Sequence, residues 1–297
     1  MMQGNRYIAP EILEPLSLSQ LAQIIHRRPR ALLMGGGVHV RVNQDSELFS
    51  LPAEIVLLHK VAELTRLTRN DHFLEVGASV TLQHFLEQAG EYLPPILSQT
   101  IKEIATVALR NQMTIAGSIA LPNYRSDLFV VLALLEAKVE IRDFTHRGGR
   151  GKIRKEALLR LVREGFLDIA SAEVITAIRL PITHWTHWQY RKIQRPFTSD
   201  QRTLIIAMVA RVEKAMVLGF HLIILTHGQH LFYDYNLNTQ AIGRRYPLSP
   251  KDRDYFLELL QESLTTDEES FSDYMRHVIE EVVIDFLQGR NSTFPQG

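Results

Sequence analysis

The sequence contains no cysteine among its 297 residues. Without thiols the chain cannot form disulfides, and it cannot hold an iron–sulfur cluster or a zinc ion through thiolate ligands. Any redox chemistry on this chain therefore needs an organic cofactor, and any cluster has to lie on another polypeptide.

An excess of charge of either sign is also absent. Lysine and arginine total 33, aspartate and glutamate total 33, and the formal net charge is zero. A balanced chain has no overall attraction to nucleic acid or to an anionic membrane surface. No apolar run reaches the roughly 18–20 residues of a membrane span, and the first residues show no basic stretch before an apolar one. We expect a soluble, cytoplasmic protein that binds neither nucleic acid nor membrane.

Hydrophobic residues make up 45% of the chain, which is enough for two domains with cores of their own. The pattern breaks between Pro181 and Trp188, so we place a domain boundary there. The predicted organisation is a first domain over 1–183, with parts of about 1–60 and 61–183, a second domain over 184–290, and a tail over 291–297.

Apolar residues at helical spacing predict the helices, and short apolar or alternating runs predict the strands. Ser17 and Thr81 are candidate N-caps, and Pro29 ends the first helix. The expected helices cover 18–28, 82–86, 101–109, 129–137, 250–263 and 269–287. The expected strands cover 31–34, 54–58, 73–78, 138–142, 172–181, 204–212, 215–220 and 221–226. The strand over 54–58 is the second strand of a predicted βαβ unit.

Two glycine-bearing turns are the most informative feature that is present. The first is Gly35–Gly37, directly after an apolar strand, and the second is the segment Arg110–Ser118. Glycine has no Cβ and can take φ > 0, so the N–H groups of such turns can converge on an anion. With the downstream carboxylate of Asp127, the two turns suit a long ligand that has a diphosphate in its middle and a ribose at one side.

Each of these features also has a plainer interpretation. The glycines match neither the dinucleotide fingerprint G-x-G-x-x-G nor a P-loop, and a tight turn after a strand explains them equally well. The segment Thr114–Ser118 is then a surface loop, and Asp127 caps the helix that follows it. Lys192 can reach across the domain boundary to a flavin or a phosphate, or it is a solvated lysine on a strand.

Two histidine pairs and one basic run are further candidates. His184 with His187 and His227 with His230 supply too few ligands for a zinc site, which needs four in fixed geometry, so we expect no metal on this chain. Arg147–Lys155 is basic but carries no aromatic platform, and we interpret it as a solvated turn rather than a nucleic-acid site.

Six separated segments, in this order and at this spacing, resemble the FAD-binding subunit of the molybdenum hydroxylases. That family includes the flavoprotein subunits of xanthine dehydrogenase and carbon monoxide dehydrogenase. The segments are LLMGGG (32–37), LEVGASVT (74–81), IATVALRNQMTIAGSIALPNYRSD (104–127), EVITAIRLP (173–181), YRKIQR (190–195) and DYMRHV (273–278). The resemblance implies an α+β fold: a PCMH-type FAD-binding domain of two subdomains over 1–183, then a smaller α+β domain like the C-terminal domain of the carbon monoxide dehydrogenase flavoprotein.

The resemblance also implies a cofactor site for FAD. It places Asp127 at the adenosine part of the cofactor, Ile175 beside the flavin and Lys192 at the isoalloxazine. The residues implied around the diphosphate are Leu32, Leu33, Met34, Gly35, Gly36, Gly37 and Val38 on the first turn, and Thr114, Ala116, Gly117 and Ser118 on the second.

The function implied is that of an oxidoreductase component without a substrate site or catalytic residue of its own. A molybdopterin-binding large subunit would oxidise the substrate, an iron–sulfur small subunit would carry the electrons to FAD, and NAD or another acceptor would take them from FAD. The absence of cysteine agrees with clusters that lie on a partner.

Four residues depart from the family pattern. Gly37 and Val38 replace a polar pair, Ala116 replaces a glycine, and Ser118 replaces an asparagine. Each lost neutral hydrogen bond costs about 1 kcal/mol, so three together approach a hundredfold in affinity. The alternative is therefore a member that has lost FAD and serves as a structural scaffold subunit.

Overall fold

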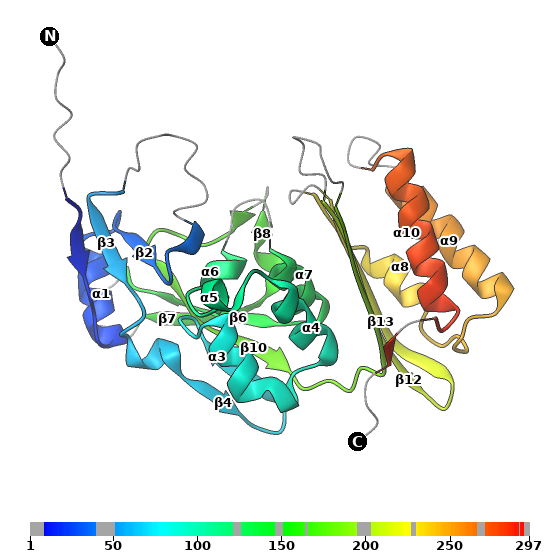
Figure 1. Ribbon diagram of the computed structural model, residues 1–297, viewed down its shortest axis with the longest axis horizontal. Coiled ribbons are helices and arrows are strands. Elements are labelled where there is room, and N and C mark those ends of the chain that lie inside the picture. The colour runs from blue at the N-terminus through cyan, green and yellow to red at the C-terminus, as the bar shows by residue number, and fades with distance from the viewer. Residues whose placement is uncertain are drawn as a thin grey trace, which may run out of the picture.

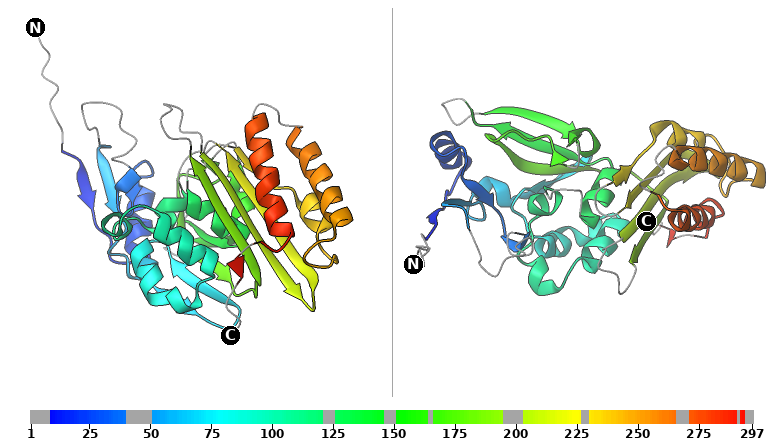
Figure 2. Two further views of the ribbon diagram at one scale, coloured as in Figure 1. Left: turned by 45° about the vertical axis from the view of Figure 1, so that its right-hand side comes forward. Right: turned by 90° about the horizontal axis from the view of Figure 1, so that it is seen from above.

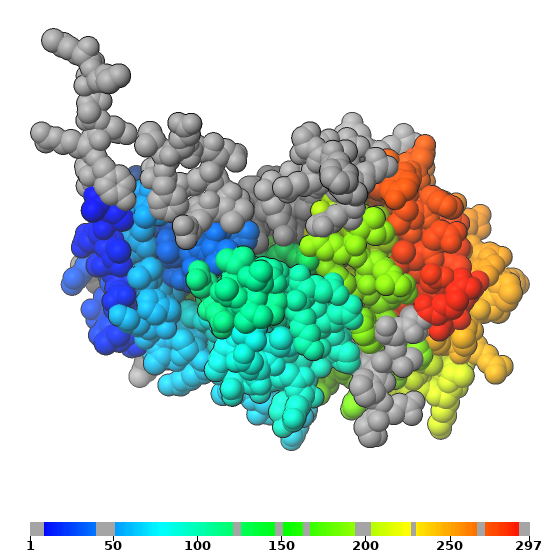
Figure 3. Space-filling view, in the orientation of Figure 1, coloured from blue at the N-terminus to red at the C-terminus, as the bar shows by residue number. Residues whose placement is uncertain are grey.

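The computed structural model describes residues 9–39, 51–120, 126–145, 151–163, 166–194, 203–226, 230–265, 271–290 and 292–293. Three layers follow one another along the long axis of the molecule (Figure 1). They are a small N-terminal sheet, a middle sheet covered by helices, and a C-terminal sheet with helices on its outer side. The space-filling view shows the same order, with the helical middle part between the two ends (Figure 3).

The first sheet is parallel and has the order β1 (Glu11–Leu13), β3 (Glu54–Leu57), β2 (Leu32–Met34). Helix α1 (Leu18–Arg27) connects β1 to β2. It begins where the Ser17 hydroxyl accepts a hydrogen bond from the Gln20 amide, and it ends before Pro29. The predicted N-cap is thus confirmed, and the predicted strands β2 and β3 pair in parallel. Residues 40–50, which connect these two strands, lie outside the described part of the chain, so the helix of the βαβ unit stays a prediction.

The middle sheet is antiparallel and runs in the order β4-β5-β10-β6-β7. Its strands are β4 (Leu67–Arg69), β5 (Phe73–Gly77), β10 (Glu173–Pro181), β6 (Lys138–Asp143) and β7 (Lys152–Ala157). The helices beside it are α3 (Leu82–Ala89), α4 (Pro95–Glu103), α5 (Val107–Arg110), α6 (Ile115–Ile119) and α7 (Asp127–Leu134). Short elements complete this part: η1 (Ala62–Thr65), η2 (Gly90–Tyr92), η4 (Leu158–Leu161), β8 (Val162–Arg163) and β9 (Phe166–Leu167).

Helix α7 is the central element of the molecule. All eight of its residues are buried, so it shows no polar face. Figure 2 shows why, because α7 lies between the middle part of the protein and the C-terminal sheet. The predicted helix over 129–137 is too long at its end, because the chain turns at Leu135 and Glu136 takes a positive φ of 59°.

The C-terminal sheet is antiparallel and runs in the order β14-β13-β12-β11-β15. Its strands are β14 (His230–Phe232), β13 (Met216–Thr226), β12 (Thr203–Glu213), β11 (His187–Gln194) and β15 (Ser292–Thr293), and its helices are α8 (Tyr235–Gln240), α9 (Pro250–Thr265) and α10 (Asp273–Leu287). Strand β12 alternates between two cores. Ile205 and Ala207 belong to the core shared with α7, and Ile206 and Met208 belong to the core shared with α9 and α10. Both faces of this sheet are therefore covered.

Three further predicted elements are wrong in extent. The segments 215–220 and 221–226 form one strand, β13, because His221 continues the ladder and turns its ring toward the carbonyl oxygen of Leu134. The predicted helix over 101–109 is two helices, α4 and α5, and Ala105 between them has a positive φ of 51°. No helix among the described residues is long and apolar enough to span a bilayer.

Candidate functional site

The structure brings the two glycine turns into contact. A Cβ on Gly35 would lie 2.5 Å from the Thr114 hydroxyl oxygen, and a Cβ on Gly36 would overlap the backbone carbonyl of Gln112. Gly37 has φ +69°, in the left-handed region that suits glycine. The first turn can therefore lie against the second turn only because two of its residues lack side chains.

The first turn offers backbone donors. Within the described part of the chain, no acceptor pairs with the amides of Gly35, Gly36 and Gly37. Gly36 is exposed, and its two neighbours are half-buried. Amides without an acceptor among the described residues are suited to bind an anion such as a diphosphate.

The second turn is different, because the amides of Ile115, Ala116 and Gly117 already have acceptors. The Ile115 amide donates to the Val80 carbonyl at 2.9 Å, and the Ala116 amide donates to the Ala78 carbonyl at 3.2 Å. The Gly117 amide donates to the Thr114 hydroxyl at 3.1 Å, which caps α6. This turn therefore contributes a short capped helix rather than a set of free donors.

Thr114 and Ser118 have structural roles at this turn. Both are buried, and the Ser118 hydroxyl and amide both donate to the carbonyl of Thr114, each at 2.9 Å. The Thr114 hydroxyl and the Ser118 side chain are thus already hydrogen-bonded within the turn. Gly117 is exposed and Ala116 is half-buried, so these two residues form the wall that is open to a ligand.

The predicted residues Asp127 and Lys192 form an ion pair. Lys192 Nζ donates to Asp127 Oδ2 at 2.8 Å, joining the start of α7 to β11. The cap of α7 is Ser126, whose hydroxyl accepts from the Phe129 amide, so the interpretation of Asp127 as the cap is wrong. The two side chains therefore lie together between α7 and β11. Their expected roles at the adenosine part and at the isoalloxazine stay predictions.

Tyr190 is a third member of this group that sequence reasoning missed. It lies two residues before Lys192 and therefore on the same face of β11. Its hydroxyl is buried near Asp127, and among the described residues no partner meets hydrogen-bond geometry with it. Burial, together with the nearby carboxylate of Asp127, raises the pKa of Tyr190 far above its usual value. The signal in the sequence that could have revealed Tyr190 is its spacing of two residues from Lys192, because such residues lie on the same face of a strand.

Arg110 is a second missed residue, and it shapes the second turn. Its buried guanidinium donates to the carbonyl oxygens of Lys102, Ile104 and Ala105 and to the side chain of Gln83. The three carbonyl groups lie at the end of α4 and directly after it, and Gln83 lies on α3. Arg110 therefore holds the chain break between α4 and α5 and fixes where the second turn begins.

We expect Arg110→Met to lower the free energy of unfolding by about 2–4 kcal/mol, because several buried acceptors lose a charged donor. We expect the FAD affinity to fall as well, since the second turn loses the hydrogen bonds of Arg110 that fix where it begins. Urea denaturation of both proteins measures the change, and Arg160→Met, at an exposed arginine, is the matched control. An Arg110→Met protein as stable as the control would contradict this role.

The remaining predicted residues have apolar environments. Ile175 is buried in the middle sheet, next to a bulge in the pairing of β10 with β6. Leu33 and Ala116 pack against the core around α7. Leu32, Met34 and Val38 are half-buried beside the first turn.

The other sequence candidates do not form a site. Among the described residues, no group of three or more histidine and acidic side chains could hold a metal ion. His227 and the first part of the basic run lie outside the described residues. Arg154, in the rest of that run, donates to both carboxylate oxygens of Glu173, at 2.9 and 2.8 Å, and the Lys155 ammonium lies 3.8 Å from Glu140.

A family model for the FAD binding domain in molybdopterin dehydrogenase matches residues 7–183. The chain belongs to this family. The match confirms the family inferred from the six sequence segments, and it ends at residue 183, between β10 and β11. No curated protein matches the sequence.

Solved structures share the fold over nearly the whole chain. A chain of quinoline 2-oxidoreductase from Pseudomonas putida 86 is 20% identical, with a TM-score of 0.75, covering 95% of this chain and 98% of that chain. A chain of carbon monoxide dehydrogenase from Hydrogenophaga pseudoflava, in a form that lacks the Mo-pyranopterin moiety of its cofactor, is 18% identical with a TM-score of 0.76. The match covers 96% of this chain and 99% of that chain. A chain of reconstituted CO dehydrogenase from Oligotropha carboxidovorans is 18% identical with a TM-score of 0.77. The match covers 95% of this chain and 99% of that chain. These matches confirm the predicted α+β architecture.

Proposed function

We propose that this chain binds FAD at the contact between its two glycine turns and serves as the flavoprotein subunit of a molybdenum hydroxylase. The observation that carries the proposal is the first turn. In a chain of an FAD-binding family, Gly35–Gly37 present amides that have no acceptor among the described residues, directly against the second turn. Bound there, FAD supplies the capacity to accept and release electrons.

The residues present fit FAD with one change from the sequence-based expectation: the first turn supplies the amides for the diphosphate, and the second turn does not. The diphosphate lies on the amides of Gly35–Gly37, and Ala116 and Gly117 form the facing wall. The internal hydrogen bonds of the second turn explain why Ala116 can replace a glycine, since its amide already bonds to Ala78 and is not needed by the ligand.

Asp127 and Lys192 both bind the isoalloxazine end of FAD. The pyrimidine edge of a flavin alternates hydrogen-bond donor and acceptors, and a carboxylate beside an ammonium complements such an edge. The ion pair keeps both groups in place before the ligand binds, which reduces the entropy that binding would cost. The Tyr190 hydroxyl lies beside Asp127 and adds a further donor.

Partners supply the rest of the reaction. We place substrate oxidation on a molybdopterin-binding subunit and electron delivery on an iron–sulfur subunit, and NAD or another acceptor takes the electrons, in the cytoplasm. The cysteine-free composition and the similarity to carbon monoxide dehydrogenase, an enzyme with a molybdenum cofactor, support this division. Co-purification of both partner subunits with this chain, in one complex, is the expected result.

The test is a titration of the purified full chain with FAD, followed by visible absorption and by quenching of flavin fluorescence. We expect one FAD per chain, and much weaker binding of riboflavin, because riboflavin lacks the diphosphate that the first turn holds. A chain that binds neither compound is a scaffold subunit and contradicts the proposal. Equal affinity for FAD and riboflavin would show that the first turn does not hold the diphosphate.

A further inference from the structure

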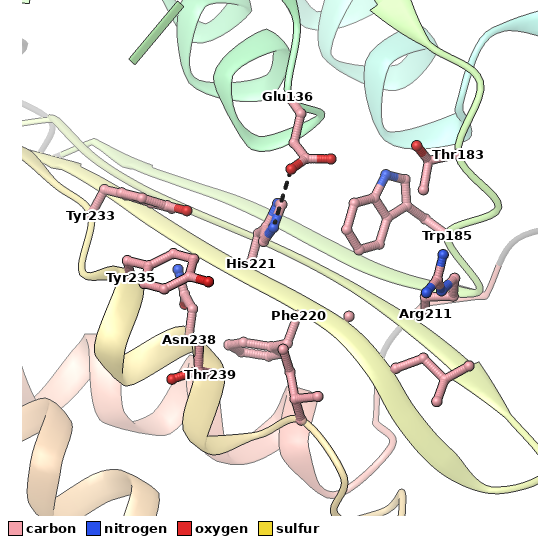
Figure 4. A pocket seen from close by; sticks show the side chains of 13 residues that line it. Glu136, Thr183, Trp185, Arg211, Phe220, His221, Tyr233, Tyr235, Asn238 and Thr239 are labelled. Carbon is pink, nitrogen blue, oxygen red and sulfur yellow. Dashed lines mark ion pairs between the residues drawn. The ribbon is translucent and has the colours of Figure 1, made fainter. Parts of the chain in front are cut away.

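A pocket of about 260 Å³ lies between the end of α7 and the C-terminal sheet, and none of its residues belongs to the glycine turns. Its lining comes from three parts of the chain: Glu136 after α7, Thr183 and Trp185 between β10 and β11, and residues of β12, β13 and α8. Figure 4 shows these side chains gathered around one opening. The pocket exists only where the C-terminal sheet meets the rest of the protein.

Aromatic rings form one wall of this pocket. The rings of Trp185 and His221 have centroids 5.0 Å apart, and those of His221 and Tyr233 have centroids 6.5 Å apart at nearly a right angle. Tyr235 lies at the mouth with 68% of its surface exposed. Packed rings at a wall and a free ring at the mouth provide stacking surfaces for a flat ligand.

A buried amide supplies a donor without a partner. Asn238 is 3% exposed, and its Oδ1 accepts from the Leu222 amide at 3.1 Å. Within the described residues its Nδ2 has no hydrogen-bond partner, although the Tyr233 hydroxyl lies close to it. A buried amide group that lacks a partner is unfavourable, so an acceptor atom of a ligand would stabilise it.

His221 supplies the complementary acceptor. Its Nδ1 lies 2.9 Å from the Leu134 carbonyl oxygen, and because a carbonyl only accepts, Nδ1 carries the proton. In the neutral ring Nε2 is then an acceptor, and it lies 3.9 Å from the carboxylate of Glu136 (Figure 4). The lining of the pocket therefore includes one donor, at Asn238, and one acceptor, at His221.

We propose that this pocket binds a flat heteroaromatic molecule of one or two rings that carries both an acceptor and a donor at its edge. Its volume lies just below the usual range of ligand pockets, about 300–1,000 Å³, which excludes a whole dinucleotide. The ring stacks on Trp185 and Tyr235, its acceptor meets Asn238 Nδ2, and its donor meets His221 Nε2.

Binding is tested on the full chain with adenine and nicotinamide as probes and benzene as the apolar control, by calorimetry and by Trp185 fluorescence. We expect at least one heteroaromatic probe to bind at millimolar or lower concentration and benzene to bind at least tenfold more weakly. Equal binding of benzene overturns the role of the polar groups, and no binding of either probe overturns the proposal.

Two variants keep the test independent of folding. A Cβ on Gly219 would meet the Trp185 ring at 3.4 Å and Arg211 Cβ at 3.7 Å, which are ordinary contacts, so Gly219→Val fills the pocket on an extended strand. Asn238→Asp keeps the acceptor for Leu222 and removes the donor. We expect each to weaken probe binding at least tenfold, with FAD binding unchanged. A correctly folded Gly219→Val protein that binds the probes like the wild type overturns the proposal.

Discussion

Replacing Gly36 by alanine is expected to abolish FAD binding and to lower the free energy of unfolding by about 1–3 kcal/mol or more. The added Cβ overlaps the Gln112 carbonyl, which is backbone and cannot rotate away. The two turns must then separate, and the donors of Gly35–Gly37 move away from the wall of Ala116 and Gly117. We expect the FAD affinity to fall by more than a hundredfold in a fluorescence titration.

Gly90→Ala is the matched control for this substitution. A Cβ on Gly90 meets nothing within 4 Å, and its φ of −52° suits any residue. Its stability should therefore be unchanged or higher by about 0.5–1 kcal/mol, since alanine loses less backbone freedom on folding. If Gly36→Ala bound FAD as tightly as Gly90→Ala, the contact between the turns would have no role in the site.

Replacing Lys192 by methionine is expected to have the second-largest effect. Asp127 is buried and would lose the cation that neutralises it. Loss of one partner of a fully buried pair costs about 3–5 kcal/mol, and because 31% of the Lys192 side chain is exposed, we expect about 1–3 kcal/mol here. FAD affinity should fall at least tenfold, because the ammonium that meets the isoalloxazine edge is gone.

Two further variants separate stability from ligand binding. Adding Asp127→Asn to Lys192→Met should restore most of the stability and none of the FAD affinity, because the unpaired charge disappears but the ligand contacts do not return. Tyr190→Phe should keep the stability of the wild type, since the lost hydroxyl has no well-aligned hydrogen-bond partner among the described residues. Urea denaturation and FAD titration of the set measure both quantities. Full FAD affinity in the double variant would contradict the role of the pair.

Local signals made much of the fold predictable from sequence. Ser17 and Thr81 cap α1 and α3 as expected, because capping depends on residues three positions away. The long α9 and α10 followed from the spacing of their apolar residues. In the middle sheet, β5, β6 and β10 were predicted from short apolar or alternating runs, whereas β4 and β7 were missed, and the start of β7 had been interpreted as a solvated turn.

Contacts between distant segments were not predictable in this way. The break between α4 and α5 depends on the guanidinium of Arg110, which a pattern of apolar residues does not reveal. The ion pair joins Asp127 to Lys192 across 65 positions. The amides of the second turn are occupied because Val80 and Ala78 supply acceptors from another loop. The sequence therefore located the turns correctly, and only the structure shows that they differ as donors.

The most direct measurement is a crystal structure of this chain grown with excess FAD. The account predicts the diphosphate within hydrogen-bond distance of the amides of Gly35, Gly36 and Gly37, with Ala116 and Gly117 facing it and Asp127 and Lys192 at the isoalloxazine. A cofactor bound elsewhere, or turns that enclose no anion when FAD is present in excess, would contradict it.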